Sequence, residues 1–317
     1  MTITAIIPVY NRATVVTRTL QSVLAQSRRP DELVLVDNCS TDATLQVLEA
    51  FKAGHDGPSM RIKVVQEAVH TAAAARNRGL AEATADWVMF FDSDDVMLPQ
   101  LVSSYEQAVE AHPEASIVTV RAELHRQDGS VRSLTAASTD LVANHLLHGI
   151  LATQRYAARR DLVIGAGGWN PTLPGWNDWE MGLRLLLNPE ARLVHIGQEV
   201  LVHICDSGTA SITGTEFHSR CGQWEHVMDL MQAQIEGSAA LSPKERARYL
   251  RLLDYRRVVL AAHYSAEGHP ELGRELYTQA YGRLRAQKPM LGLIVPWLYQ
   301  RVRSGRRGSA RLARILI

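Results

Sequence analysis

The stretch Asp86-Trp-Val-Met-Phe-Phe-Asp92-Ser-Asp94-Asp95 joins a short apolar run to three carboxylates within four residues. An apolar run of this length, bounded by polar residues, is typical of a buried strand. Outward from it, about the first 120 residues alternate such runs with segments of helical length. Strands separated by helices predict a mostly parallel sheet with right-handed crossovers, flanked by helices. The sequence therefore predicts an α/β fold of Rossmann-like type.

The same reading sets expected boundaries. The predicted strands are Thr2–Pro8, Glu32–Asp37, Arg61–Gln66, Asp86–Phe91 and Ala115–Arg121, with helices at 13–26, 42–53, 70–84 and 99–111. After a turn at 127–130, we expect a strand at 151–158, a helix at 178–187, and strands at 191–196 and 199–204. The last part predicts helices only, at 216–236, 243–266, 270–286 and from 289 onward. We therefore expect a body at 1–214, with halves 1–115 and 116–214, and a helical C-terminal region at 215–317.

The charge is distributed unevenly along a chain of globular composition, 46% hydrophobic and 21% charged. The last acidic residue is Glu275, and residues 276–317 carry nine Arg or Lys. Because the whole chain is +1, the first 275 residues carry −8. A basic tail on an acidic body indicates a membrane surface or another anionic partner. We expect no nucleic-acid partner.

The cysteines and apolar runs bear on location. Cys39, Cys205 and Cys221 show no CxxC spacing, which fits a reducing compartment. The N-terminal run breaks at Pro8 and has no basic segment before it, which is not the pattern of a signal peptide. The longest later run, Met290–Tyr299, is about half of the ~20 residues that a membrane span needs. These features predict a cytoplasmic protein.

Three polar loops follow predicted strands, where ligands bind in parallel sheets. The loop Asp92–Asp95 packs carboxylates whose like charges disfavour mutual ionisation. A divalent cation with hard oxygen ligands, Mg²⁺ or Mn²⁺, would relieve that repulsion. The alternative is a solvated acidic turn that caps the next helix.

The other two loops offer groups for a nucleotide. In Pro8–Arg12, Tyr10 could face a nucleobase and Arg12 could approach phosphate, although an ordinary turn with an exposed arginine has the same pattern. In Asp37–Asp42, a carboxylate and the Asn38 amide suit a uracil or ribose edge, and the alternative is a helix cap. Arg76, in an Ala-rich helix, could meet a diphosphate or make a surface ion pair. Neither GxGxxG nor GxxxxGK[ST] is present, which argues against a dehydrogenase or a P-loop NTPase.

Taken together, Ile6–Arg12, Leu35–Asp42, Ala75–Gly79 and Phe90–Asp95 resemble glycosyltransferase family 2, which has the GT-A fold. The resemblance makes 1–115 the nucleotide-binding half and 116–214 the acceptor half. It implies that the nucleotide of the sugar donor is held by Pro8, Tyr10, Asp37, Asn38 and Arg76, and that Asp92 reaches its ribose side. Arg12, from the loop itself, completes the residues expected to bind the donor. The resemblance also implies that Asp94 and Asp95, in a DXD-type motif, hold Mn²⁺ or Mg²⁺. Many relatives carry Asp where this chain has Asn38, which leaves the identity of the nucleotide open.

A second resemblance lies in Gly167-Gly-Trp-Asn170 and Gly175-Trp-Asn-Asp178-Trp-Glu180, which are similar to the family's acceptor-side motif. There a Glu-Asp pair opens a helix and the Asp is the catalytic base. This chain has Asn177 in place of Glu and keeps Asp178, which we expect to deprotonate the acceptor hydroxyl. Glu180 is the substitute carboxylate, and Trp176 is a candidate wall for the acceptor sugar. The alternative for Asp178 is a simple helix N-cap. The alternative for the tryptophans is that they are core aromatics, and this interpretation is preferred for Trp179.

His203 comes at the end of a predicted strand, where the family often has a histidine that completes the metal or diphosphate site. A lone histidine at a strand end can also be structural. Together these residues predict an inverting, metal-dependent transfer of a sugar, from a UDP-sugar, to a glycan or lipid-linked acceptor in cell-surface polysaccharide assembly. The competing interpretations are a catalytically inactive binding subunit and a sugar-phosphate nucleotidyltransferase, although Pro8–Arg12 lacks the glycines that the latter needs.

The basic tail predicts contact with the cytoplasmic face of a membrane. The run Met290–Tyr299 and the arginines after it could lie in an anionic interface, with Trp297 and Tyr299 at headgroup depth. The alternative is that the run packs on the body or on a second subunit of a homo-oligomer. Gly305 and Gly308, which weaken a continuous helix, keep that alternative open.

Overall fold

A computed structural model describes residues 1–136, 139–206, 216–306 and 308–317. The chain forms two compact units. The first comprises Met1–Ala137, Ile150–Met181 and Glu190–Gly208, and the second comprises Ser138–Gly149, Gly182–Pro189 and Thr209–Ile317. The boundary expected near Gly214 lies outside the described residues, and the division into 1–214 and 215–317 stays a prediction.

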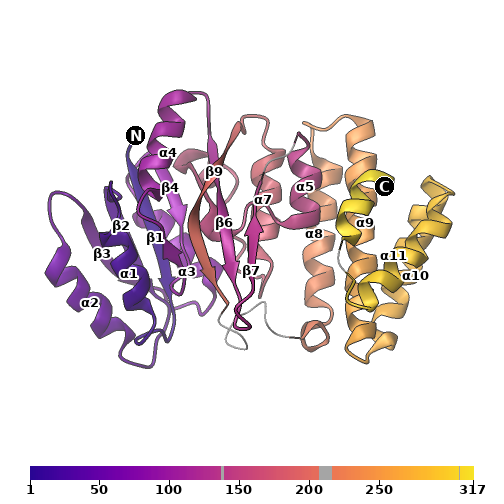
Figure 1. Ribbon diagram of the computed structural model, residues 1–317, viewed down its shortest axis with the longest axis horizontal. Coiled ribbons are helices and arrows are strands. Elements are labelled where there is room, and N and C mark those ends of the chain that lie inside the picture. The colour runs from indigo at the N-terminus through magenta and orange to yellow at the C-terminus, as the bar shows by residue number, and fades with distance from the viewer. Residues whose placement is uncertain (137–138, 207–215, 307) are drawn as a thin grey trace. The chain divides into compact units, whose positions relative to one another are not determined.

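The first unit is built on a nine-stranded sheet, and most of its strands are labelled in Figure 1. Its strands are β1 (Ile3–Val9), β2 (Glu32–Asp37), β3 (Arg61–Gln66), β4 (Trp87–Phe90), β5 (Val96–Met97), β6 (Ile117–His125), β7 (Val131–Leu134), β8 (Tyr156–Arg159) and β9 (Leu193–Cys205). Their order is β3-β2-β1-β4-β8-β6-β9-β5, and β7 pairs with β6. Strands β1, β2, β3 and β4 pair in parallel, as do β6 and β9. Because β8 is antiparallel to both β4 and β6, only β5, β7 and β8 oppose the common direction. The expectation of a mostly parallel sheet is confirmed.

Helices cover both faces of the sheet because the central strands are buried on both sides. Helices α1 (Val16–Leu24), α2 (Thr44–His55) and α4 (Leu101–Ala111) share one hydrophobic core with alternate residues of β1, such as Ile3 and Ile7. Helix α3 (Ala72–Glu82) contacts β1 and β2. At Gly79 an added Cβ would lie 2.3 Å from Ile6 Cγ2, which faces away from that core, so this position must be glycine for α3 to approach the sheet.

Several elements differ from those expected. The two-residue strand β5, the strand β7, and helices α5 (Leu141–His148) and α6 (Arg160–Gly165) were not predicted. The strand predicted at 151–158 is wrong in its first half: Thr153–Arg155 is a 3₁₀ turn whose polar residues point inward, and only β8 is extended. The two strands predicted at 191–204 are one strand, β9, because register shifts near Arg121 absorb the polar segment between them.

The second unit is helical, as expected. It contains α5, α8 (Gln223–Gly237), α9 (Pro243–Ala266), α10 (Pro270–Gln287), α11 (Leu291–Arg303) and α12 (Ser309–Leu316). Helix α9 contacts the other five helices. The helix predicted from 216 begins only at Gln223, after the 3₁₀ turn Phe217–Arg220, because Gly222 has a φ of 82°. A buried carboxylate, Asp254, accepts hydrogen bonds from Arg257 and Arg283 and ties α9 to α10.

The predicted final segment is two helices, with Gly305 at φ 69° and Gly308 at φ 90° between them. Leu291, Val295 and Leu298 form the buried side of α11, which contacts α9 and α10. The apolar run therefore packs in part on helices of its own unit, whereas the alternative interpretation expected it on the body or on a second subunit. No helix in the described part of the chain is both long and apolar enough to cross a membrane.

Candidate functional site

The carboxyl ends of β1 and β2 lie level, because Val9 pairs with Asp37. Beyond β1, Tyr10 is 39% exposed and its ring centroid lies 4.2 Å from that of His70. Pro8 pairs with Val36 inside the sheet. Two aromatic rings thus stand together at the strand ends, where a planar base could stack, and His70 was not among the predicted site residues.

Asp37 is 1% exposed, and its Oδ1 has no hydrogen-bond partner among the described residues. A buried carboxylate oxygen without a donor is costly, so it indicates that a ligand supplies one. Asn38 is arranged differently: its Nδ2 donates to the carbonyl oxygens of Glu67 and Val69. The amide predicted to read a base therefore also holds the loop that follows β3.

Arg12 follows Asn11, which has a φ of 49°. Its backbone N–H donates to Thr44 Oγ1, and its Nη1 donates to the carbonyl of Asn11. Asn11 Oδ1 accepts the N–H of Thr41, which joins this loop to the one after β2. The two loops therefore form one connected surface at the strand ends.

Arg76 lies at the centre of the site. It is 6% exposed, its Nη2 donates to Asp92 Oδ1 at 2.8 Å, and its Nη1 donates to Asn177 Oδ1 at 3.3 Å. Its guanidinium also lies 4.6 Å from the centre of the Trp169 ring, within the range of a cation–π contact. The structure thus brings the predicted donor residues Arg76 and Asp92 together with the start of α7 (Asn177–Leu187).

The acidic turn after β4 is held by its neighbours. Thr19 Oγ1 donates to the carbonyls of Ser93 and Asp95. Asp95 is 2% exposed, and its two carboxylate oxygens accept hydrogen bonds from Cys205 N at 2.8 Å and Gln154 Nε2 at 2.6 Å. Asp92 and Asp94 are more exposed. Asp95 therefore anchors the turn to β9, and Asp94 is more open to a ligand.

The charges in this turn oppose one another. Burial, together with the nearby charges of Asp92 and Asp94, raises the pKa of Asp95 to about 8. Ionising Asp95 beside Asp92 and Asp94 is therefore unfavourable, and a bound cation would relieve the repulsion. Oxygen ligands with excess negative charge suit Mg²⁺ or Mn²⁺, so the donor set fits the expected cation.

Asp178 lies in the first turn of α7 and accepts a hydrogen bond from the N–H of Trp179. Burial raises its pKa above the ordinary aspartate value, the charge of Arg76 lowers it, and the charge of Asp92 raises it again. The predicted base is thus in electrostatic contact with the predicted donor residues. A carboxyl group whose pKa is raised is a better proton acceptor than an ordinary aspartate.

Asn77 is a positioning residue that the sequence did not reveal. Its Oδ1 accepts the N–H of Trp169 at 2.8 Å, and its Nδ2 donates to the Trp169 carbonyl at 2.7 Å. Gly168 has a φ of 66°, and a Cβ there would lie 2.7 Å from Asn77 Oδ1, so only glycine fits. The signal was present as a polar residue inside an Ala-rich helix, next to Arg76.

The acceptor-side aromatics lie close together. Trp176, which is partly exposed, has a φ of 53°, and its ring meets that of Trp179 edge-on with centroids 5.3 Å apart. Trp179 is 7% exposed, which fits the interpretation of this residue as a core aromatic. Glu180 is 2% exposed. A positive φ is uncommon for a bulky residue, and strain of this kind is concentrated at functional sites.

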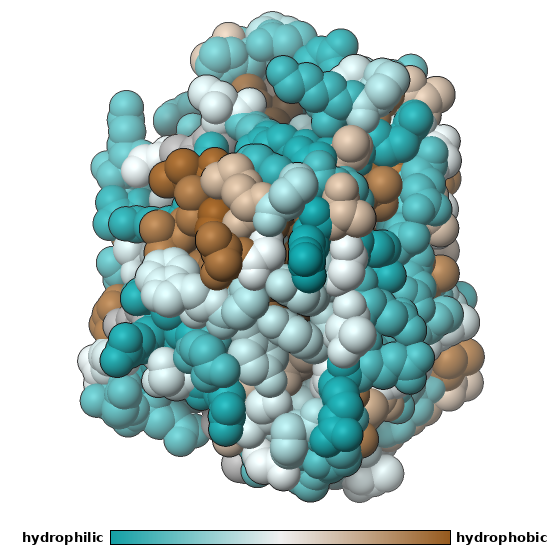
Figure 2. Space-filling view, turned by 90° about the vertical axis from the view of Figure 1, so that its right-hand side faces the viewer, coloured by the Kyte–Doolittle hydropathy of each residue, from teal (hydrophilic) through white to brown (hydrophobic). Residues whose placement is uncertain are grey.

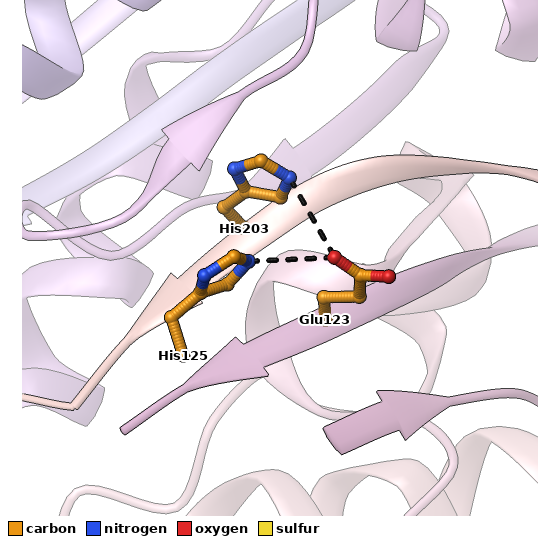
Figure 3. Close-up of side chains that lie close together, drawn as sticks. All are labelled: Glu123, His125 and His203. Carbon is orange, nitrogen blue, oxygen red and sulfur yellow. Dashed lines mark ion pairs between the residues drawn. The ribbon is translucent and has the colours of Figure 1, made fainter. Parts of the chain in front are cut away.

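His203 lies with two residues that were not predicted. Its Nε2 is 3.9 Å from Glu123 Oε2, and its ring centroid is 4.4 Å from that of His125 (Figure 3). On β9, the residue that donates a hydrogen bond to Asp95 is Cys205, two positions beyond His203. The assignment of His203 to the donor metal stays a prediction.

Comparison with known proteins finds relatives for part of the chain. Residues 4–148 match the family described as Glycosyl transferase family 2. An uncharacterized glycosyltransferase of Nostoc sp. is 34% identical over 139 residues, which cover 44% of this chain and 41% of the relative. The poly(ribitol-phosphate) beta-N-acetylglucosaminyltransferase TarS of Staphylococcus aureus is 26% identical over 163 residues, 49% of this chain and 27% of that protein. The matches to the first three curated relatives span between 41% and 62% of their lengths.

Solved structures match over a larger part of the chain. The crystal structure of S. aureus TarS 1–349 in complex with UDP-GlcNAc has a TM-score of 0.74 at 19% identity, and the match covers 99% of this chain and 91% of that chain. The mannosyltransferase PcManGT from Pyrobaculum calidifontis, in complex with GDP-Man and Mn²⁺, has a TM-score of 0.57 at 18% identity, with 99% and 87% covered.

The fold is therefore the GT-A fold, as in S. aureus TarS. Over residues 4–148, the chain is similar to glycosyltransferase family 2.

Proposed function

We propose that this chain is an inverting, metal-dependent glycosyltransferase that moves a sugar from a UDP-sugar to an acceptor hydroxyl in cell-surface polysaccharide or glycan assembly. One observation carries the proposal. Arg76 joins the two halves of the site, because it bonds to Asp92 on the donor side and to Asn177 at the start of the acceptor-side helix. A single displacement needs both sides within reach of one reacting carbon.

The residues of this site have distinct tasks in the proposal. Asp178 takes the proton of the acceptor hydroxyl as its oxygen attacks the anomeric carbon, so the configuration inverts. Arg76 stabilises the negative charge of the departing nucleoside diphosphate, and the low exposure of its guanidinium strengthens that effect. Trp176 borders the acceptor, beside Asp178.

The acidic turn supplies the metal ligands. Asp94, and Asp95 behind it, would hold Mn²⁺ or Mg²⁺, which would neutralise charge on the diphosphate. The raised pKa of Asp95 supports this assignment, because a cation would favour its ionised form. We leave His203 out of this ligand set, since its described contacts are with Glu123 and His125.

The nucleotide is assigned from its hydrogen-bonding needs. The unpaired Asp37 Oδ1 calls for an N–H donor, which uracil has at its ring nitrogen, and Tyr10 with His70 offers a stacking surface. The solved TarS structure with UDP-GlcNAc supports a uridine nucleotide. Guanine also has a ring N–H, so GDP-sugars are the competing donor class.

The experiment is a panel of UDP-, GDP- and dTDP-sugars, measured by thermal shift and by donor hydrolysis with and without Mn²⁺. Donor at one hundred times its dissociation constant stabilises the fold by about 2.7 kcal/mol. We expect a UDP-sugar to give a Mn²⁺-dependent shift and slow hydrolysis. Binding without any turnover would favour the inactive subunit. Pyrophosphate release from UTP and a sugar phosphate would favour the nucleotidyltransferase.

We also propose that the second unit attaches peripherally to an anionic membrane, where a lipid-linked acceptor would be found. Apolar side chains gather on the face shown in Figure 2. Met290, just before α11, is 51% exposed, and on the helix Leu293 is 85% and Trp297 49% exposed. The Arg301 guanidinium lies 5.1 Å from the centre of the Trp297 ring. Exposed apolar residues beside arginines are typical of interfacial helices.

A further inference from the structure

Two neighbouring strands bring three metal-ligating side chains to one place outside the acidic turn. Strands β6 and β9 pair in parallel, with Glu123 opposite His203. His125 lies two residues beyond Glu123 on β6, so its side chain is on the same face of the strand. The three side chains converge between the strands (Figure 3).

The distances suit a bound ion. Glu123 Oε2 is 3.4 Å from His125 Nε2 and 3.9 Å from His203 Nε2. One ligand atom from each residue lies within 4.8 Å of the other two. Metal–ligand bonds to imidazole and carboxylate are about 2.0–2.2 Å long, so ligands of one ion are separated by roughly 3–4 Å.

The surroundings favour an ion over a simple ion pair. His125 Nε2 is buried and has no hydrogen-bond partner among the described residues, although Glu123 lies near it. The three side chains are 27% to 38% exposed, so an ion can reach them from solvent.

We propose that Glu123, His125 and His203 form a binding site for one divalent transition-metal ion, with Zn²⁺ as the preferred ion. This site is separate from the metal site proposed at the acidic turn Asp92–Asp95. Two imidazoles and one carboxylate are a ligand set for Zn²⁺, Co²⁺ or Ni²⁺, whereas Mg²⁺ prefers oxygen ligands. Three protein ligands leave a position for water. The inference does not depend on the proposed transfer reaction.

An ion there would join β6 to β9 next to the acidic turn. Cys205, two residues beyond His203, holds Asp95 through its backbone N–H. The ion therefore stabilises the strand on which the acidic turn rests, and Zn²⁺ raises the melting temperature of the metal-free chain.

The test is a Zn²⁺ titration of the metal-stripped full chain against a chromophoric chelator, without nucleotide. The variants are His125→Gln and His203→Gln, with His195→Gln as the matched control. His195 lies on the same strand but bonds to Thr119 and Thr135 instead. Asp94→Asn separates this ion from the one at the acidic turn.

We expect one Zn²⁺ per chain in the wild type, His195→Gln and Asp94→Asn, and at least a tenfold loss of affinity in the two cluster variants. Equal affinity in all five proteins, or loss in Asp94→Asn alone, would overturn the proposal. If a cluster variant does not fold, X-ray absorption spectroscopy of the wild-type protein with bound Zn²⁺ identifies the ligands of the ion instead. Two imidazole ligands support the site, and an all-oxygen shell, or no bound Zn²⁺, refutes it.

Discussion

Arg76 Nη2 lies 2.8 Å from Asp92 Oδ1, and this pair links helix α3 to the end of strand β4 at the centre of the site. The Arg76 side chain is 7% exposed and that of Asp92 32%, so the cation is sheltered while its partner faces solvent. A ligand phosphate could therefore reach the guanidinium from the exposed side. Until a phosphate binds, the ion pair with Asp92 holds the Arg76 guanidinium in position.

The first prediction tests this cation. Arg76→Met is expected to lower kcat by roughly 100- to 1000-fold, the scale for losing one group that stabilises developing charge. The control is Arg78→Met on the same helix, whose exposed ion pair with Glu82 contributes little. Steady-state kinetics with the best donor measures both. Equal losses in the two variants would show that Arg76 is only structural.

The second prediction concerns the base. Asp178→Asn should keep donor affinity near normal while turnover falls by roughly 100-fold or more. The pKa of Asp178 is raised, so the acid limb of the kcat profile should lie above the ordinary aspartate pKa of about 4. A raised pKa also means that folding favours the protonated form, and stability is lost as pH rises through it. Asp178→Asn should therefore be no less stable than wild type at pH 7.

The alternative base is Glu180, which is 2% exposed. Glu180→Gln should leave the acid limb where it is. If turnover survives in Asp178→Asn and collapses in Glu180→Gln, the wrong carboxylate has been assigned.

The third prediction concerns the metal. Asp94→Ala should abolish transfer and remove Mn²⁺-dependent nucleotide binding, because the remaining carboxylates repel a diphosphate that lacks its cation. Calorimetric titration of UDP with and without Mn²⁺ measures the effect. Unchanged metal dependence in this variant would contradict the assignment.

The parallel half of the fold could be predicted because its signals are local. The strands β1, β2 and β3 lie within a residue of their predicted bounds, since each apolar run is set off by polar loops. Strand β5 could not be predicted, because two residues, Val96 and Met97, have no periodicity and are extended only through pairing with β9. The 3₁₀ turn at Thr153–Arg155 could not be predicted either, because its polar side chains are buried only through tertiary contacts.

Site residues that directly follow a strand could be predicted from the sequence. Contacts between side chains that are far apart in the sequence could not. The strand-end rule located Asp37 and Asp92, which lie at the carboxyl ends of β2 and β4, the parallel strands on either side of β1. The tie between Asn77 and Trp169 spans 92 residues, so only the folded chain shows it. The same holds for the pairing of His203 with Glu123.

The fourth prediction tests the close approach of α3. Gly79→Ala places a methyl 2.3 Å from Ile6 Cγ2, so we expect a loss of about 1–3 kcal/mol in the free energy of unfolding. The control is Gly54→Ala in helix α2, where nothing lies within 4 Å of the added Cβ. That change should stabilise the protein by about 0.4–1 kcal/mol. Urea unfolding compares the two, and equal effects would refute the packing argument.

The last prediction separates membrane contact from simple packing of the tail. Leu293 is 85% exposed on α11, opposite the buried Leu291 and Val295, so Leu293→Asp should leave the fold intact. We expect it to lower sedimentation with anionic vesicles severalfold, because it removes apolar area and adds a charge that anionic lipids repel. The matched control is Val131→Asp on β7, at a side chain that is 52% exposed. Wild type should bind anionic vesicles better than neutral ones, and added salt should weaken binding because the arginines of the tail are screened. Equal partitioning of the two variants, or binding that does not respond to salt, would show that the exposed face of α11 has another partner.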